Sequence, residues 1–205
     1  MTRNASVSPL ACLVIFAVVW LALAIAPRYR EDWLLENLPT FVFVPALVWT
    51  HRRFRFSDRS YVRMTIFLLL HTIGSHYTYS EVPMGGWLQE GLGLSRNHYD
   101  RFVHLAFGFL FVRPVGELIR RSTPGAGAVA ICVLSIASVA ALSVGYELLE
   151  WATAAVVDPA AGTAFLGTQG DPWDAQKDMA LAVGGALAAA LLDLAEAKRT
   201  PIEPR

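Results

Sequence analysis

Six long apolar runs, separated by short polar stretches, constrain the fold of this chain more than any other feature. They lie near residues 9–26, 34–50, 61–75, 102–118, 127–149 and 175–192. Each run is close to the roughly 17–25 residues that a helix needs to cross a bilayer, the third being the shortest. The chain is 55% hydrophobic and 17% charged, which is unlike a soluble globular domain. The sequence therefore predicts an all-α polytopic membrane helix bundle of about six transmembrane helices, forming a single domain over residues 1–205.

Basic residues collect on one predicted side of this bundle. The second loop, residues 51–59, is strongly basic, and the pairs Arg120-Arg121 and Lys198-Arg199 fall on the same side. Short basic loops stay in the cytoplasm, so both termini are predicted to be cytoplasmic. The formal net charge is zero, so the balance of charges gives no reason to expect a nucleic-acid partner. The expected partner is the lipid bilayer, and the sequence leaves the oligomeric state open.

Acids and histidines gather at the opposite ends of the predicted helices. Ionisable groups in or near a membrane are expensive, so a convergent set of them is a candidate site. His71 is predicted about one turn below the interface, and His76 lies about 140° around the helix from it. These two imidazoles can share a ligand only if the helix unwinds near Gly74. Asp32 and Glu36 begin the second helix, where the helix dipole favours carboxylates whatever their role.

The fourth predicted helix carries the sharpest local signal. Asp100 and His104 stand at i and i+4 and therefore share one face at the start of this helix. They can bind one metal, or Asp100 can cap the helix while His104 acts as a general base or ligand. The structural alternative is a cap together with a hydrogen bond in the core.

Two glutamates close the fifth predicted helix. Glu147 and Glu150 lie on neighbouring positions of one face, where two carboxylates repel each other unless something compensates them. Either one of them keeps its proton, or a cation such as a metal ion, a protonated histidine or an arginine neutralises the pair. A purely structural contact with Arg101 is the alternative interpretation.

The sixth predicted helix also begins with acids on one face. Asp174 and Asp178 are again at i and i+4, and Asp178 is expected about one turn inside the membrane, where an unpaired charge is hard to tolerate. Asp171, just before Pro172, is predicted to be a turn or cap residue. The small residues 184–186 predict a surface for close helix contact.

Several polar motifs occur together along most of the chain. They are Asp32-Trp33 with Glu36-Asn37, Leu70-His71 with His76-Tyr77-Thr78-Tyr79, Val82-Pro83, Arg96-Asn97 with Tyr99-Asp100-Arg101 and His104, Tyr146-Glu147 with Glu150-Trp151, and Gly167-Thr168-Gln169-Gly170-Asp171 with Trp173-Asp174 and Asp178-Met179. With these motifs, residues 32–187 resemble the YjdF-type bacterial inner-membrane family. The resemblance implies a multi-pass protein of the bacterial cytoplasmic (inner) membrane and supplies no reaction.

A weaker resemblance, over residues 100–191, is to VanZ-like membrane proteins, which are linked to glycopeptide-antibiotic tolerance. Those proteins pair an Asp-x-x-x-His helix start with later helices that carry Glu and Asp. Here Glu150 stands where they often have glutamine, and Ala182 stands where an asparagine is expected. The resemblance therefore implies a similar polar bundle and not antibiotic tolerance.

The leading hypothesis is a metal-assisted membrane enzyme that faces outward and acts on a lipid or lipid-linked head group. Oxygen and imidazole ligands suit a divalent ion such as Zn²⁺, Mn²⁺ or Fe²⁺. The candidate ligands are His71, His104, Glu147, Glu150 and Asp178. Asp100 or Asp174 would support the ligands or act as a general base, and Arg101 would clamp an anion. The rival hypothesis is a non-enzymatic protein, either a small cation- or proton-coupled transporter or a structural bundle, although the apolar inner half disfavours a through-route.

Overall fold

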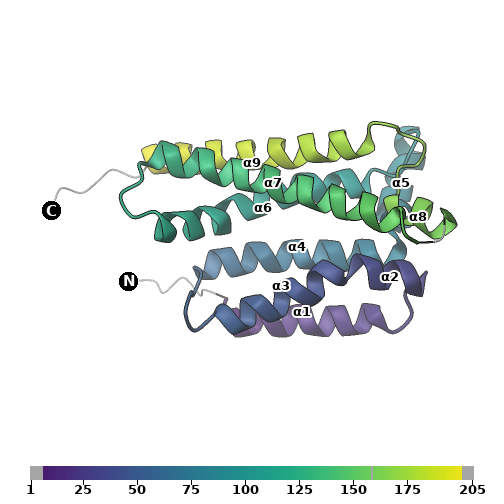
Figure 1. The fold of residues 1–205 in the computed structure, drawn as a ribbon, viewed down its shortest axis with the longest axis horizontal. Helices are drawn as coiled ribbons and strands as arrows, with labels where there is room; N and C mark the ends of the chain where they lie inside the picture. The colour runs from purple at the N-terminus through teal and green to yellow at the C-terminus, as the bar shows by residue number, and fades with distance from the viewer. Residues whose placement is uncertain (1–6, 158, 200–205) are drawn as a thin grey trace.

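A computed structural model of the chain describes residues 7–157 and 159–199. Within these ranges the chain forms helices and no strand. The helices, with one short 3₁₀ turn named η1, are α1 (Pro9–Ala24), α2 (Arg30–Glu36), α3 (Leu38–Thr50), α4 (Asp58–Tyr77), η1 (Tyr79–Glu81), α5 (Pro83–Leu92), α6 (Tyr99–Ser122), α7 (Ala128–Ala154), α8 (Pro159–Leu166) and α9 (Asp174–Arg199). Figure 1 shows the long helices running side by side, with α2, α5 and α8 at one end of the bundle. The all-α prediction is confirmed.

Helices α6, α7 and the first 20 residues of α9 are long and apolar enough to cross a membrane. Helices α2 and α3, bent by 42° at Asn37, make a fourth candidate span if they are counted together. Helix α1 is apolar but shorter. A membrane helix bundle is therefore supported, whereas the prediction of six crossings stays a prediction.

Capping residues set several of the helix ends. Ser8 and Ser57 cap α1 and α4, because their side-chain oxygens accept hydrogen bonds from backbone N–H groups at 3.2 Å and 3.3 Å. Gly93 ends α5 with a left-handed backbone, which a residue without a Cβ adopts freely. The third and fifth predicted loops, which were expected only to connect helices, contain the short helices α5 and α8.

Glycines bring α6 and α9 together. A Cβ added to Gly108 would overlap the carbonyl oxygen of Ala182, and one added to Gly185 would overlap that of Leu105. No larger residue fits at either position without moving backbone. The predicted close-contact surface at residues 184–186 is therefore confirmed at Gly185, whereas Gly184 faces open space, and the contact fixes α9 against the helix that carries Asp100 and His104.

The basic segments lie at the end of the bundle away from α2, α5 and α8 (Figure 1). The loop between α3 and α4 meets the end of α6 there, where the Arg121 guanidinium stands 4.3 Å from the centre of the Phe54 ring. Glu117 of α6 accepts hydrogen bonds from Ser57 and Ser60 at the start of α4. Glu117 therefore joins α6 to the start of α4 through hydrogen bonds between the two helices.

Candidate functional site

Asp100, His104 and Asp178 form a buried cluster where α6 and α9 begin. Each residue offers one ligand atom, and these atoms all lie within 4.8 Å of one another. Asp100 Oδ1 is 3.6 Å from His104 Nε2. His104 is 8% exposed and Asp178 only 2%. The i and i+4 spacing on α6 aligns the first two groups, and the glycine contact holds the third beside them.

Glu147 of α7 extends the cluster. Its Oε1 atom is 3.4 Å from His104 Nε2, on the side where Asp100 also approaches. Glu147 Oε1 and Asp178 Oδ1 are both buried, and neither has a hydrogen-bond partner among the described residues. Buried polar atoms normally find partners, so these two oxygens point to a missing proton or cation.

Glu150 and Glu36 lie beside this cluster. Glu150 is close enough to Asp100, Glu36 and Glu147 to repel them electrostatically. The Tyr146 hydroxyl donates a hydrogen bond of 3.1 Å to Glu36, which stabilises that carboxyl at the bend between α2 and α3. Acids from four helices, α2, α6, α7 and α9, therefore surround one small volume.

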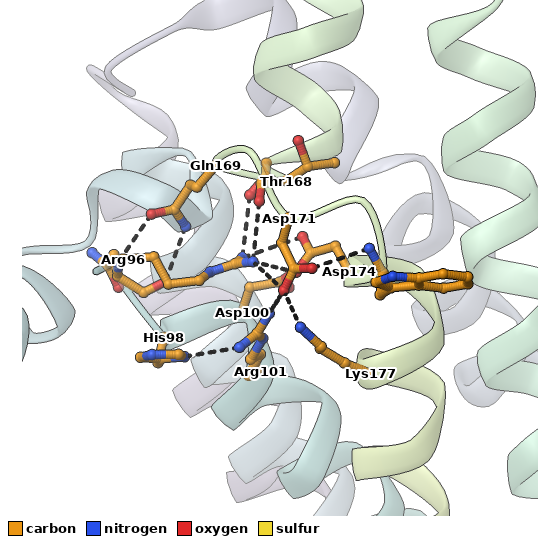
Figure 2. A network of polar contacts seen from close by, with 12 residues as sticks. Arg96, His98, Asp100, Arg101, Thr168, Gln169, Asp171, Asp174 and Lys177 are labelled. Atoms are coloured by element: carbon orange, nitrogen blue, oxygen red, sulfur yellow. Dashed lines mark hydrogen bonds and ion pairs between the residues drawn. The ribbon is translucent and has the colours of Figure 1, made fainter. Parts of the chain in front are cut away.

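Arginines occupy the outer edge of the site, as Figure 2 shows. Arg96, which is 4% exposed, holds both carboxylate oxygens of Asp174 and donates to the carbonyl oxygens of Thr168 and Gly167 at 3.1 Å and 3.3 Å. Arg101 contacts the same Asp174 at 3.2 Å and also forms an ion pair with Asp171. These contacts neutralise Asp174 and fasten the loop before α9 to the start of α6.

Asp171 lies outside the membrane-spanning helices and is the centre of a second group of contacts. Lys177 donates to it at 2.6 Å, and the Trp173 backbone N–H donates at 3.0 Å. The pKa of the Asp171 carboxyl is lowered, first by the Lys177 hydrogen bond and then by those from Trp173 and Arg101. The predicted turn residue therefore also carries a charge-stabilised carboxylate.

The distribution of charge separates the site into two parts. Arg96, Arg101 and Lys177 are matched by Asp171 and Asp174. Among the ion pairs of the described residues, Asp100 and Glu147 are paired only with the His104 imidazole, and Asp178 has no ion pair, although Arg96 and Arg101 act on Asp100, and Arg101 on Asp178, from farther away. A buried carboxylate must be protonated or paired, so this inner part has room for positive charge.

The structure places His71 apart from this cluster. Its Nδ1 atom is 2.5 Å from the Tyr79 hydroxyl, and its Nε2 atom is 3.0 Å from the backbone carbonyl oxygen of Glu36. His76 contacts a different element: its Nδ1 atom is 2.7 Å from the carbonyl oxygen of Leu23 in α1. Helix α4 continues through both histidines, so they share no ligand, and a metal role for His71 would require one of its hydrogen bonds to break.

The outer edge also contains residues that were not predicted as functional. Gln169 and Asn97 exchange two hydrogen bonds of 2.9 Å, each between a side chain and a backbone group. Arg96 also holds this loop, but no local sequence pattern predicts its pairing with Asp174, which lies 78 residues away in the sequence. Their presence in adjoining polar motifs is the signal that could have drawn attention to them.

A cavity of about 440 Å³ lies below the cluster, between α3, α4, α6 and α7. Polar side chains line one end of it, and apolar ones line the rest. The polar residues are Thr40, His71, Tyr79, Asp100, His104, Ser143 and Tyr146, and the apolar ones include Phe43, Phe67, Phe107, Phe111, Leu142 and Leu149. Because Asp100 and His104 belong to both the cavity and the cluster, a molecule in the cavity can reach the ligand atoms.

Helices able to span a membrane, with a buried acidic and histidine cluster at one end, define a helical membrane protein with a possible site for a cation. The family described as "Predicted membrane protein (DUF2238)" matches residues 8–199. The chain belongs to this family. It is also 36% identical over 163 residues to the inner membrane protein YjdF of Escherichia coli (strain K12), covering 80% of this chain and 78% of that protein. No solved structure matches the chain. The resemblance to the YjdF-type family is thus confirmed, and the likeness to VanZ-like proteins stays a prediction.

Proposed function

We propose that the chain is a divalent-cation-dependent enzyme that acts on the head group of a lipid or lipid-linked substrate. The observation that carries this proposal is the triad of Asp100, His104 and Asp178, with Glu147 Oε1, which has no hydrogen-bond partner among the described residues, 3.4 Å from His104 Nε2. Three carboxylates and one imidazole suit Zn²⁺, Mn²⁺ or Fe²⁺.

The proposed roles follow from these positions. Asp100, His104, Asp178 and Glu147 would hold the ion, and Glu150 would add negative charge behind them. A bound divalent ion can polarise a phosphoryl or carbonyl oxygen and activate water. Asp174, held by Arg96, would keep the start of α9 in place. Arg101, whose Nε atom has no hydrogen-bond partner among the described residues, would contact an anionic head group.

The proposed orientation places this site on the outer face of the membrane. The basic loop between α3 and α4 and the basic end of α6 lie at the opposite end of the bundle. Basic segments stay in the cytoplasm. The terminal residues 1–6 and 200–205 lie outside the described residues. The proposal that both termini are cytoplasmic therefore follows from the ends of α1 and α9 beside them.

Elemental analysis of the detergent-purified protein tests the metal. We would compare the wild type with Asp178→Asn and His104→Ala, after equilibration with Zn²⁺, Mn²⁺ or Fe²⁺, and check folding by size exclusion. Asp193→Asn is the matched control, because Asp193 is also on α9 but faces Arg63 and Arg113 at 3.9 Å. We expect near-stoichiometric metal in the wild type and the control, and loss in both site variants.

Folded wild-type protein that binds none of these ions would refute the proposal. The buried acids would then have to carry protons, which is the chemistry of the alternative, a small proton- or cation-coupled transporter. Proton or cation flux into liposomes that Asp178→Asn abolishes would favour that alternative.

A further inference from the structure

The cavity next to the acidic cluster has a largely apolar lining. Its volume of about 440 Å³ is within the roughly 300–1,000 Å³ typical of small-molecule sites. Phenylalanines from three helices form most of its depth: Phe43 of α3, Phe67 of α4, and Phe107 and Phe111 of α6. Along these phenylalanines a hydrocarbon chain would lose no hydrogen bonds on entry, although Thr40 and Ser143 add two hydroxyl groups to the lining.

One wall of the cavity is continuous with the outer surface of α7. Leu142 and Leu149 line the cavity and yet are 53% and 43% exposed. By contrast, Val103 and Phe111 on the opposite wall are 4% and 8% exposed. In a membrane the exposed side of α7 faces lipid, so the cavity is reached from the bilayer past these two leucines.

We infer that this cavity holds one hydrocarbon chain of a membrane phospholipid, which enters laterally past Leu142 and Leu149 and places its phosphate beside Asp100 and His104. The position of the phosphate rests on the proposed function, because only a bound cation makes this acidic end attractive to an anion. Binding of the hydrocarbon chain depends on the apolar walls alone. The volume is too small for a helix of another protein, whose diameter is about 10–12 Å.

Photolabelling of the full-length protein tests the inference. The probe is a phosphatidylglycerol with a diazirine near the end of one acyl chain, mixed into vesicles of phosphatidylethanolamine and phosphatidylglycerol. After illumination, mass spectrometry locates the labelled residues. Lipids around the bundle can label exposed residues of α7, but they cannot reach Val103 or Phe111. Label on Val103 or Phe111 is therefore the expected result and is what α6 labelling means below, because Leu105 of the same helix is 40% exposed and surrounding lipid can reach it.

Two variants fill the cavity. Gly145 lines the cavity, and a Cβ added there meets no atom within 4 Å, so Gly145→Phe adds a ring to the lining without moving backbone. Gly184→Phe is the matched control, because a Cβ there also meets nothing and Gly184 does not line the cavity. Ala141→Phe fills the same space from a second position. We expect each cavity variant to reduce labelling of α6 by about tenfold or more, which corresponds to about 1.4 kcal/mol, and the control to leave it unchanged.

Label confined to exposed residues, or α6 labelling that both cavity variants leave at the wild-type level, would overturn the inference. Metal content measured on the same samples separates this outcome from a failure of the proposed function. Strong α6 labelling in protein that binds no metal would support the chain site and refute the cation-dependent enzyme. Bound metal without α6 labelling would refute the chain site alone.

Discussion

The contact between α6 and α9 gives the sharpest prediction, because it supports both the fold and the site. Gly185→Ala would place a methyl group 2.9 Å from the Phe109 amide nitrogen and closer still to the Leu105 carbonyl oxygen. Both obstacles are backbone atoms of a helix, so they cannot turn away as a side chain can. The two helices would have to separate.

Overpacking of this kind costs about 1–3 kcal/mol, and the rigid backbone on both sides places this case near about 3 kcal/mol. For a chain of this length each kcal/mol shifts the melting temperature by roughly 2–4 °C. We therefore expect Gly185→Ala to melt about 6–12 °C below the wild type. Because Asp178 would move away from Asp100 and His104, the affinity for a divalent cation should fall in the same variant.

Thermal unfolding in detergent, followed by size exclusion, measures the first effect, and cation titration measures the second. Gly184→Ala is the control, since its new methyl group meets nothing and alanine favours the helix by up to about 1 kcal/mol. If Gly185→Ala melted at the same temperature as Gly184→Ala, the close contact would not be the support that we describe.

Three further predictions concern the charged groups. Arg96→Gln should cost about 3–5 kcal/mol, because it leaves Asp174 buried without its main partner, and unfolding at the wild-type temperature would contradict the role of Arg96. The lowered pKa of Asp171 means that its contribution to stability is present above the unfolded pKa of about 3.9 and is lost as the pH falls below it; the melting temperature should therefore drop more between about pH 6 and about pH 3.5 in the wild type than in Asp171→Asn, and equal drops would refute this. Glu117→Ala should cost about 1–3 kcal/mol by removing the acceptor for Ser57 and Ser60, while cation binding at the other end stays unchanged; altered binding would show that the two ends are coupled.

The long helices and the proximity of Asp100, His104 and Asp178 could be predicted because both depend on regular spacing, although the sequence favoured Asp100 as a support or general base and not as a ligand. Apolar runs of bilayer length indicate helices. Polar residues at i and i+4 of such a helix, as in Asp100 with His104 and Asp174 with Asp178, lie on one face of it. Asp100, His104 and Asp178 needed only one further fact, that the starts of α6 and α9 meet, and the small residues near Gly185 indicated that contact.

The remaining features depend on contacts that no local pattern encodes. His71 was grouped with the ligands because it lies at the correct depth, but the Tyr79 hydroxyl and the Glu36 carbonyl oxygen approach it from other elements. Arg101 was considered a partner for Glu147 and Glu150, whereas it is paired with Asp171 and Asp174. In both cases a side chain with several partners within reach takes the one that the tertiary fold brings nearest.

The pairing of Arg96 with Asp174 also has a consequence for biogenesis. The ribosome makes the acid 78 residues after the arginine, so α6 enters the membrane before its neutralising partner exists. Before α9 is made, the two arginines Arg96 and Arg101 and the acids of the earlier helices lack the residues that they contact in the folded protein. The ion pairs and the triad both need residues of α9, so neither can form before that helix is made.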